Sequence, residues 1–314
     1  MQKETVSTVA MACVMVISQS VALLLAPIFI VTGAYAFPDP DDPVNPLIYI
    51  ILILVFTAVI LGIVKMRKQN VVKYIILGSM ALAMVIVYFI PFYVLLYDVD
   101  PGGTVAFLLS VVTSAGLTFA LIKKPEWYVV DAVGISVAAG VTAILGISFT
   151  ILPAILLLIG LAVYDAISVY KTKHMVTLAD AVAGERLPVL LVIPKSKKYS
   201  FMKQKGLKEQ IASGEEREAM FMGLGDMIIP GTLVVSALAS NVDKLSVMVI
   251  GITGPVLVAV GTLIGGLLGF LALMRFVQKG NPQAGLPLLN SGVILGYLVT
   301  YYLIFQDLSF GIRF

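Results

Sequence analysis

Two aspartates lie within long apolar stretches, Asp165 in "LAVYDAISVY" and Asp226 in "MFMGLGDMIIP", and neither has a basic residue beside it in its own stretch. A carboxylate in the hydrocarbon region of a membrane is costly unless it is paired, hydrated or protonated, so each is a functional candidate. Two carboxylates that face each other at low dielectric cannot both ionise easily, and they share a proton. That state suits hydrolysis, in which the ionised acid takes a proton from water while the neutral one polarises a carbonyl.

The same two residues fit two other interpretations. Transporters use intramembrane carboxylates to carry protons or cations, and a buried acid pair can simply join two helices. A proton- or cation-coupled transporter usually contains internal repeats, which this sequence lacks. From the carboxylates alone, protease, transporter and structural pair all stay open.

Glycines precede the second aspartate, at Gly223 and Gly225. Because glycine has no side chain, another backbone can approach it closely, and it tolerates an irregular helix start. A peptide substrate must come within hydrogen-bonding distance of a catalytic acid, which gives one reason for glycine here. Close packing between membrane helices gives another.

A third element opens the last apolar stretch, "NPQAGLPLLNSG", with Ala284-Gly285-Leu286-Pro287 at its centre. Proline and glycine at a helix entrance would keep the first turn loose. Unwound backbone at membrane depth is tolerated where it lines a water-containing cavity. An ordinary helix start with proline near its first turn is the alternative.

Composition determines the class of protein. Of 314 residues, 60% are hydrophobic and only 12% are charged, which indicates a membrane protein with many spans. Cys13 is the only cysteine and His174 the only histidine. An internal disulfide, a cysteine zinc site and a multi-histidine metal centre are therefore excluded, and neither metal nor cofactor is expected.

A helix needs about 20 apolar residues to cross a bilayer. On that basis we predict an all-α membrane protein with nine transmembrane helices. The predicted spans cover residues 7–36, 47–64, 72–97, 105–122, 128–148, 151–170, 219–239, 245–275 and 286–305.

The predicted sixth and seventh spans carry the two aspartates at similar depth. Asp165 lies about five residues, or roughly 8 Å, from the inner end of its span. Asp226 lies about seven residues, or roughly 10 Å, into the next one. Since consecutive spans run antiparallel, the two carboxylates can meet if the helices touch.

The connections between spans predict the orientation. With the N-terminus cytoplasmic and the C-terminus outside, nineteen of the 21 lysines and arginines fall on the inner side, and only Lys244 and Arg313 lie outside. The outer loops are acidic or uncharged, as in "FPDPDDPVNP". Such an excess of basic residues inside is the pattern of membrane proteins.

One sizeable connection, the cytoplasmic loop 171–218, separates the predicted sixth and seventh spans. Its residues 174–186 have helical spacing, and the apolar run "LPVLLVIP" at 187–194 predicts a strand or a membrane-surface segment. Basic residues elsewhere in the loop suit a solvated linker that binds anionic lipid headgroups. Asp131, near the inner end of the fifth span, is expected to be an interfacial residue close to lysines.

The stretches around Asp165, Asp226 and residues 284–287 lie in this order on the predicted sixth, seventh and ninth spans. Together they resemble the presenilin and signal peptide peptidase family of intramembrane aspartyl proteases. The family pattern is Tyr-Asp, then Gly-x-Gly-Asp, then Pro-Ala-Leu-Pro. Tyr164-Asp165 matches the first and Gly223-Leu224-Gly225-Asp226 the second. Ala284-Gly285-Leu286-Pro287 departs from the third, because it keeps only the leucine and the final proline.

The resemblance implies that Asp165 and Asp226 are the catalytic pair. The neighbouring residues of the motifs would support substrate binding: Tyr164, Gly223, Leu224, Gly225, Ala284, Gly285, Leu286 and Pro287. The topology resembles that of presenilin rather than signal peptide peptidase. Prepilin peptidases, which share Gly-x-Gly-Asp, usually have fewer spans, and many have a cysteine-rich loop.

The resemblance also implies an organisation and partners. Residues 1–314 would form a single nine-span domain, with scaffold spans in 1–150 and catalytic spans in 151–314. The substrates would be single-span membrane proteins in the lipid bilayer, with no nucleic acid partner. The compact chain indicates an archaeal or bacterial cell membrane and no obligatory accessory subunit, and it leaves a homo-oligomer open.

Overall fold

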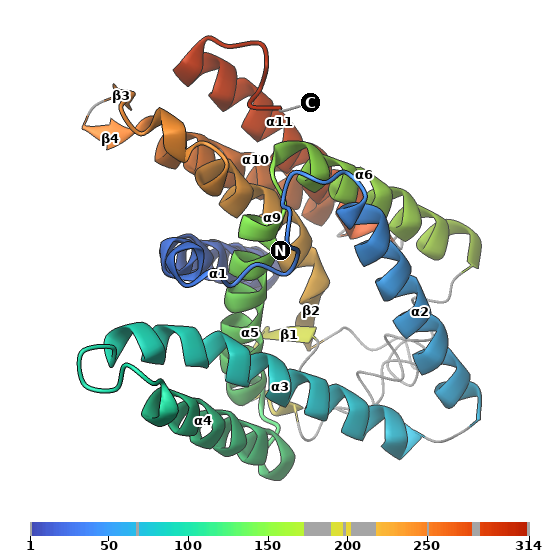
Figure 1. The fold of residues 1–314 in the computed structure, drawn as a ribbon. Helices are drawn as coiled ribbons and strands as arrows, with labels where there is room; N and C mark the ends of the chain where they lie inside the picture. The colour runs from blue at the N-terminus through green and yellow to red at the C-terminus, as the bar shows by residue number, and fades with distance from the viewer. Residues whose placement is uncertain are drawn as a thin grey trace. The chain divides into compact units, whose positions relative to one another are not determined.

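The computed structural model describes residues 2–66, 69–172, 190–196, 199–201, 218–249, 251–277 and 283–312 (Figure 1). The helix predicted at 174–186 and the first residues of the predicted strand, 187–189, lie outside these ranges.

The described part of the chain contains nine α-helices, and this confirms the all-α fold class. Eight of them are long and apolar enough to cross a membrane. The helices are α1 (Gln2–Thr32), α2 (Asn45–Lys65), α3 (Gln69–Leu95), α4 (Thr104–Lys123), α5 (Trp127–Ser148), α6 (Ile151–Ile167), α9 (Gly225–Ala239), α10 (Gly254–Val277) and α11 (Gly285–Phe305).

The predicted seventh span, 219–239, is wrong in its first third. Ala219–Gly223 forms strand β2, and helix α9 begins only at Gly225. β2 pairs antiparallel with β1 (Leu190–Pro194), which satisfies its backbone without a helix. A short apolar run ending in glycine fits either structure, and the pairing partner decides it. Asp226 is therefore the second residue of its helix, and it does not lie seven residues into a span.

The predicted eighth span, 245–275, also begins too early. Met248–Val249 and Ile252–Thr253 form a small hairpin, β3 and β4, and α10 starts at Gly254. Gly251 in the hairpin turn has a φ of 76°, a left-handed conformation that glycine adopts without strain. The apolar residues around this turn are the reason that composition alone extends the span.

The chain divides into two compact units. One contains residues 1–14, 55–138 and 174–224, and the other contains 15–54, 139–173 and 225–314. The β1–β2 sheet and Asp131 belong to the first unit. Asp165, Asp226 and the 284–287 motif all belong to the second.

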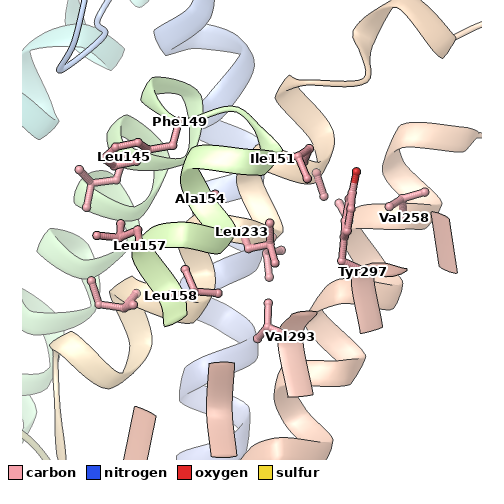
Figure 2. Close-up of a cluster of buried hydrophobic side chains, with 14 of the residues drawn as sticks. Leu145, Phe149, Ile151, Ala154, Leu157, Leu158, Leu233, Val258, Val293 and Tyr297 are labelled. Atoms are coloured by element: carbon pink, nitrogen blue, oxygen red, sulfur yellow. The ribbon is translucent and has the colours of Figure 1, made fainter. Parts of the chain in front are cut away.

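The second unit has a continuous apolar core to which α5, α6, α9, α10 and α11 contribute (Figure 2). Leu157 and Leu158 of α6, Leu233 of α9, and Val293 and Tyr297 of α11 are all fully buried in it. Since these residues come from the helices that carry the two aspartates and the 284–287 motif, the core fixes those helices against one another.

Glycines bring α10 and α11 into backbone contact. A Cβ added at Gly265 of α10 would lie 2.3 Å from the Gly292 carbonyl oxygen and 2.7 Å from the Gly296 Cα of α11. One at Gly269 would lie 2.5 Å from the Leu288 carbonyl oxygen. Small residues at four-residue spacing are the usual means of close packing between membrane helices. Here they set the position of α11, including its first turn.

The C-terminal end of α11 is fixed by a polar cluster around Lys244. Its ammonium donates to the Tyr301 hydroxyl and to Asp307 Oδ2, at 3.1 Å for the latter. Hydrogen bonds from Ser309 and Lys244 hold the pKa of the Asp307 carboxyl well below its usual range. Lys244, an exception to the predicted charge pattern, thus has its charge balanced by a carboxylate.

Gly265→Ala should destabilise the protein, because its methyl group would overlap backbone atoms of α11 that cannot move independently. The expected loss is on the order of 2 kcal/mol, measured as a lower thermal midpoint in detergent. Gly116→Ala on α4 is the control, since no described atom lies within 4 Å of its new Cβ. An equal loss in both variants would contradict the close packing of α10 and α11.

Candidate active site

Asp165 lies near the end of α6, on the face that packs into the core. The helix is almost entirely apolar, and Asp165 is only 5% exposed. A π-helical turn, Ser168–Thr172, follows directly, and the Ser168 amide donates to the Tyr164 and Asp165 carbonyls. Wide π turns are frequent at functional sites because they displace the backbone from regular helical register.

The first turn of α11 directs its backbone donors at this carboxyl group. The Leu286 amide donates to Asp165 Oδ2 at 3.1 Å, and the Gly285 amide interacts with the same carboxyl group. Ala284, at the N-cap, has no side chain that could cap the helix. Pro287 has no N–H to satisfy. Asp165 therefore acts as the cap that α11 lacks, and it does so from another helix.

The Asp226 side chain, which comes from α9, lies next to the same first turn of α11. A Cβ at Gly285 would be 3.5 Å from Asp226 Oδ1 and 3.6 Å from its Cγ, which is ordinary van der Waals contact. Asp226 is half-buried and occupies the first turn of α9. Since Leu286 binds Asp165 and Gly285 lies next to Asp226, both carboxyl groups lie at the N-terminus of α11.

The glycines before Asp226 occupy different positions. Gly225 is exposed at the start of α9, and no described atom lies within 4 Å of where its Cβ would be. Gly223 is the last residue of β2. Leu224, between them, packs against α5, with its Cδ2 3.2 Å from the Cβ position of Gly134. The open side of Gly225 therefore leaves space beside Asp226.

The remaining motif residues have mainly packing roles in the structure. Tyr164 is half-buried on α6, and no described interaction joins its hydroxyl to Asp165. Ala284 is buried at the α11 N-cap, and the Leu286 side chain packs against the apolar core.

Two further hydrogen bonds join α6 and the π-helical turn after it to α11 and the residues just before it, and the sequence analysis missed both. Asn290 Nδ2 donates to the Leu158 carbonyl at 2.8 Å, and the Tyr170 hydroxyl donates to Gln283 Oε1 at 2.8 Å. With the Asp165 contact between them, these bonds hold the two helices together on both sides of the carboxyl group. A single asparagine in the apolar "PLLNSG" was the available signal.

The first unit contains the two-stranded sheet. Strand β1 covers Leu190–Pro194, which confirms the predicted strand over those residues. Asp131 of α5 is buried, and its Oδ1 accepts a hydrogen bond from the Val192 amide at 2.8 Å. The expectation that Asp131 is an interfacial residue beside lysines is therefore wrong. Its distance in sequence from β1 hid this role.

Comparisons with known proteins show to which family the chain is similar. The family described as "Signal-peptide peptidase, presenilin aspartyl protease" matches residues 12–306. Two solved structures, both described as a presenilin family intramembrane aspartate protease, are 32% identical over 94% of this chain. The C222 crystal form gives a TM-score of 0.67 over 99% of its chain, and the P2 form 0.66 over 97%. No protein with a curated description matches.

Proposed function

The chain belongs to the signal-peptide peptidase and presenilin family of aspartyl proteases, and we propose that it hydrolyses peptide bonds of single-span membrane proteins with Asp165 and Asp226 as the catalytic pair. The observation that carries this proposal is the convergence of both carboxyl groups on the first turn of α11. The alternative of an ion-coupled transporter finds no support in the family assignment.

The proposed chemistry is direct attack by water. One carboxylate takes a proton from the water, whose oxygen bonds to the peptide carbonyl carbon, while the neutral carboxyl group polarises the carbonyl oxygen. The neutral carboxyl group gives its proton to the carbonyl oxygen, so that a tetrahedral diol results without a covalent enzyme intermediate. The carboxyl group that took the proton from water then passes it to the amide nitrogen as the carbon–nitrogen bond breaks, and a hydroxyl of the diol returns a proton to the other carboxylate. The products are a new carboxyl group and a new amine.

A substrate helix has to unwind before this reaction, because a helix keeps its carbonyls internally hydrogen-bonded. An unwound segment leaves backbone groups unsatisfied, and a strand edge can accept them by strand addition. β1 is already paired with β2, and on its other side the Val192 amide is bonded to Asp131. We therefore assign the docking edge to β2.

Some backbone groups of β2 face away from β1, where an added strand could bind them. In an antiparallel pair, alternate residues direct both backbone groups away from the partner strand. The Lys195 amide bonds to the Glu218 carbonyl at 2.9 Å, so the residues facing away on β2 are Ala219, Phe221 and Gly223. Gly223 is three residues before Asp226 in the chain. A peptide on this edge would run along the segment that leads into α9.

The setting follows from the family and from the charge pattern. The chain is a multi-pass integral membrane protein. We further propose that its N-terminus faces the cytoplasm, that its membrane is the cell membrane of a prokaryote, and that it acts without accessory subunits. Water would reach the aspartates from the inner side, where most basic residues lie.

Asp165→Asn and Asp226→Asn should each lower the cleavage rate of a tagged single-span substrate by about 10³-fold or more. Each change removes one proton-transferring group while leaving a hydrogen-bond acceptor of the same shape. The measurement is the initial rate of cleavage by purified protein in detergent, with the thermal midpoint as a check of folding. Substantial turnover by either folded variant would exclude the two-aspartate mechanism.

Gly225→Ala should leave the thermal midpoint unchanged, because its methyl group enters open space, but lower kcat/KM by about tenfold if a peptide occupies that space. Gly231→Ala on the same helix is the matched contrast. Its Cβ would lie 2.7 Å from Thr142 Cγ2, so its main effect should be a lower thermal midpoint. Unchanged kinetics for Gly225→Ala would place the substrate elsewhere.

A further inference from the structure

We propose that Gln19 of α1 and Thr142 of α5 form a buried site for a water molecule beside Gly231 of α9. All three residues belong to the second unit. Gly231 follows Asp226 by five residues, or about 8 Å along the helix axis. The site does not include the proposed catalytic pair, and the inference does not depend on the proposed function.

Gln19 lies in the middle of the buried face of α1. Met15, Ala22 and Ala26 recur with it at helical spacing, and all of them are buried. Met15 Cε is 3.4 Å from the Cβ position of Gly266 on α10. These apolar contacts determine which face of α1 points into the unit, so the Gln19 side chain is held there as well, with only 1% of it exposed.

The Gln19 amide has no protein partner. Both Nε2 and Oε1 are buried, and no described residue forms a hydrogen bond with either atom. Burying an amide without partners is costly, and buried polar groups in native proteins are almost always hydrogen-bonded. Two other buried polar side chains of α9 follow that rule, because Thr232 donates to the Ile228 carbonyl and Ser236 to the Phe149 carbonyl. Something other than the described residues therefore has to serve the Gln19 amide.

A second polar group lies at the same place. A Cβ at Gly231 would be 3.4 Å from Gln19 Cγ, 3.5 Å from Thr142 Oγ1 and only 2.7 Å from Thr142 Cγ2. The missing side chain at 231 therefore lets both polar residues approach the backbone of α9. Thr142 is buried too, and its hydroxyl can donate and accept. A small molecule bound to the Gln19 amide thus has a second partner beside it.

The chemistry of these groups selects water. An amide presents two N–H donors and one accepting oxygen, so a cation would engage only the oxygen and an anion only the nitrogen. Neither Gln19, Thr142 nor Gly231 has a charge that would balance an ion. Water both donates and accepts, and buried waters typically serve polar groups that otherwise lack partners. Ordered waters also satisfy polar groups inside membrane proteins.

The direct test is cross-relaxation between water and the Gln19 side-chain NH₂ in the ¹⁵N-labelled full chain in detergent. The signal is assigned by its through-bond connection to the backbone and by its loss in Gln19→Met. We expect water cross-peaks whose sign is opposite to that of chemical exchange, because the water stays bound beside the amide. Their absence at Gln19 would overturn the inference.

The Asn241 side-chain amide is the matched control. It is buried as deeply, but it donates to the Ala237 carbonyl at 2.9 Å, so it has a protein partner. It should show no such cross-peak with water. Cross-peaks of equal strength at Asn241 and Gln19 would overturn the inference, since the signal would then not depend on the missing partner.

Thr142→Val tests the second partner. The change keeps the shape of the side chain and removes its hydroxyl, so the water cross-peaks of Gln19 should weaken. Thr232→Val is the control, because the Thr232 hydroxyl donates to the Ile228 carbonyl at 2.9 Å. It should leave the Gln19 cross-peaks unchanged. Equal cross-peaks in the parent and in both folded variants would exclude Thr142 from the site and overturn the inference.

Gln19→Met gives an independent measure by stability. An amide that truly had no partner would carry a burial cost, and its replacement by methionine would raise the thermal midpoint by about 2–4 °C. An amide served by bound water carries no such cost. We therefore expect the midpoint of Gln19→Met to stay the same or to fall, and a rise of that size would overturn the inference.

Discussion

The unsatisfied amides at the start of α11 are the constraint on which the site depends. A helix begins with backbone donors that have no partner within the helix, so they need acceptors from outside it. Ala284 offers no cap, Pro287 removes one donor, and Asp165 accepts from Leu286. The Asp165 carboxyl group thus stabilises the start of the helix and, by the same contact, is held at the turn next to which Asp226 also lies.

That arrangement requires α11 to be placed closely, and glycine packing provides the placement. Gly265 and Gly269 let α10 touch the backbone of α11, while Asn290 ties α11 to α6. The helix start therefore has little freedom to move away from the carboxyl groups. The proposed catalytic pair needs such a rigid support, since small displacements of catalytic groups cost large factors in rate.

The sequence alone predicted the helices and the two aspartates, because long apolar runs and isolated carboxylates are local signals. It misplaced the start of α9, because a run such as Ala219–Gly223 becomes a strand only when a distant partner, Leu190–Pro194, pairs with it. It missed the roles of Asp131 and Asn290 for the same reason. Their partners are 61 and 132 residues away in the chain, and no periodicity connects them.

The central claim is that Asp165 and Asp226 act together on one tetrahedral centre. The most direct test is the binding of a single-span peptide in which a hydroxyl-bearing tetrahedral carbon replaces the cleaved amide. We expect the parent to bind it at least about 10²-fold more tightly than the amide peptide, and that preference to disappear in Asp165→Asn and in Asp226→Asn. Equal preference in the parent and both variants would contradict the account.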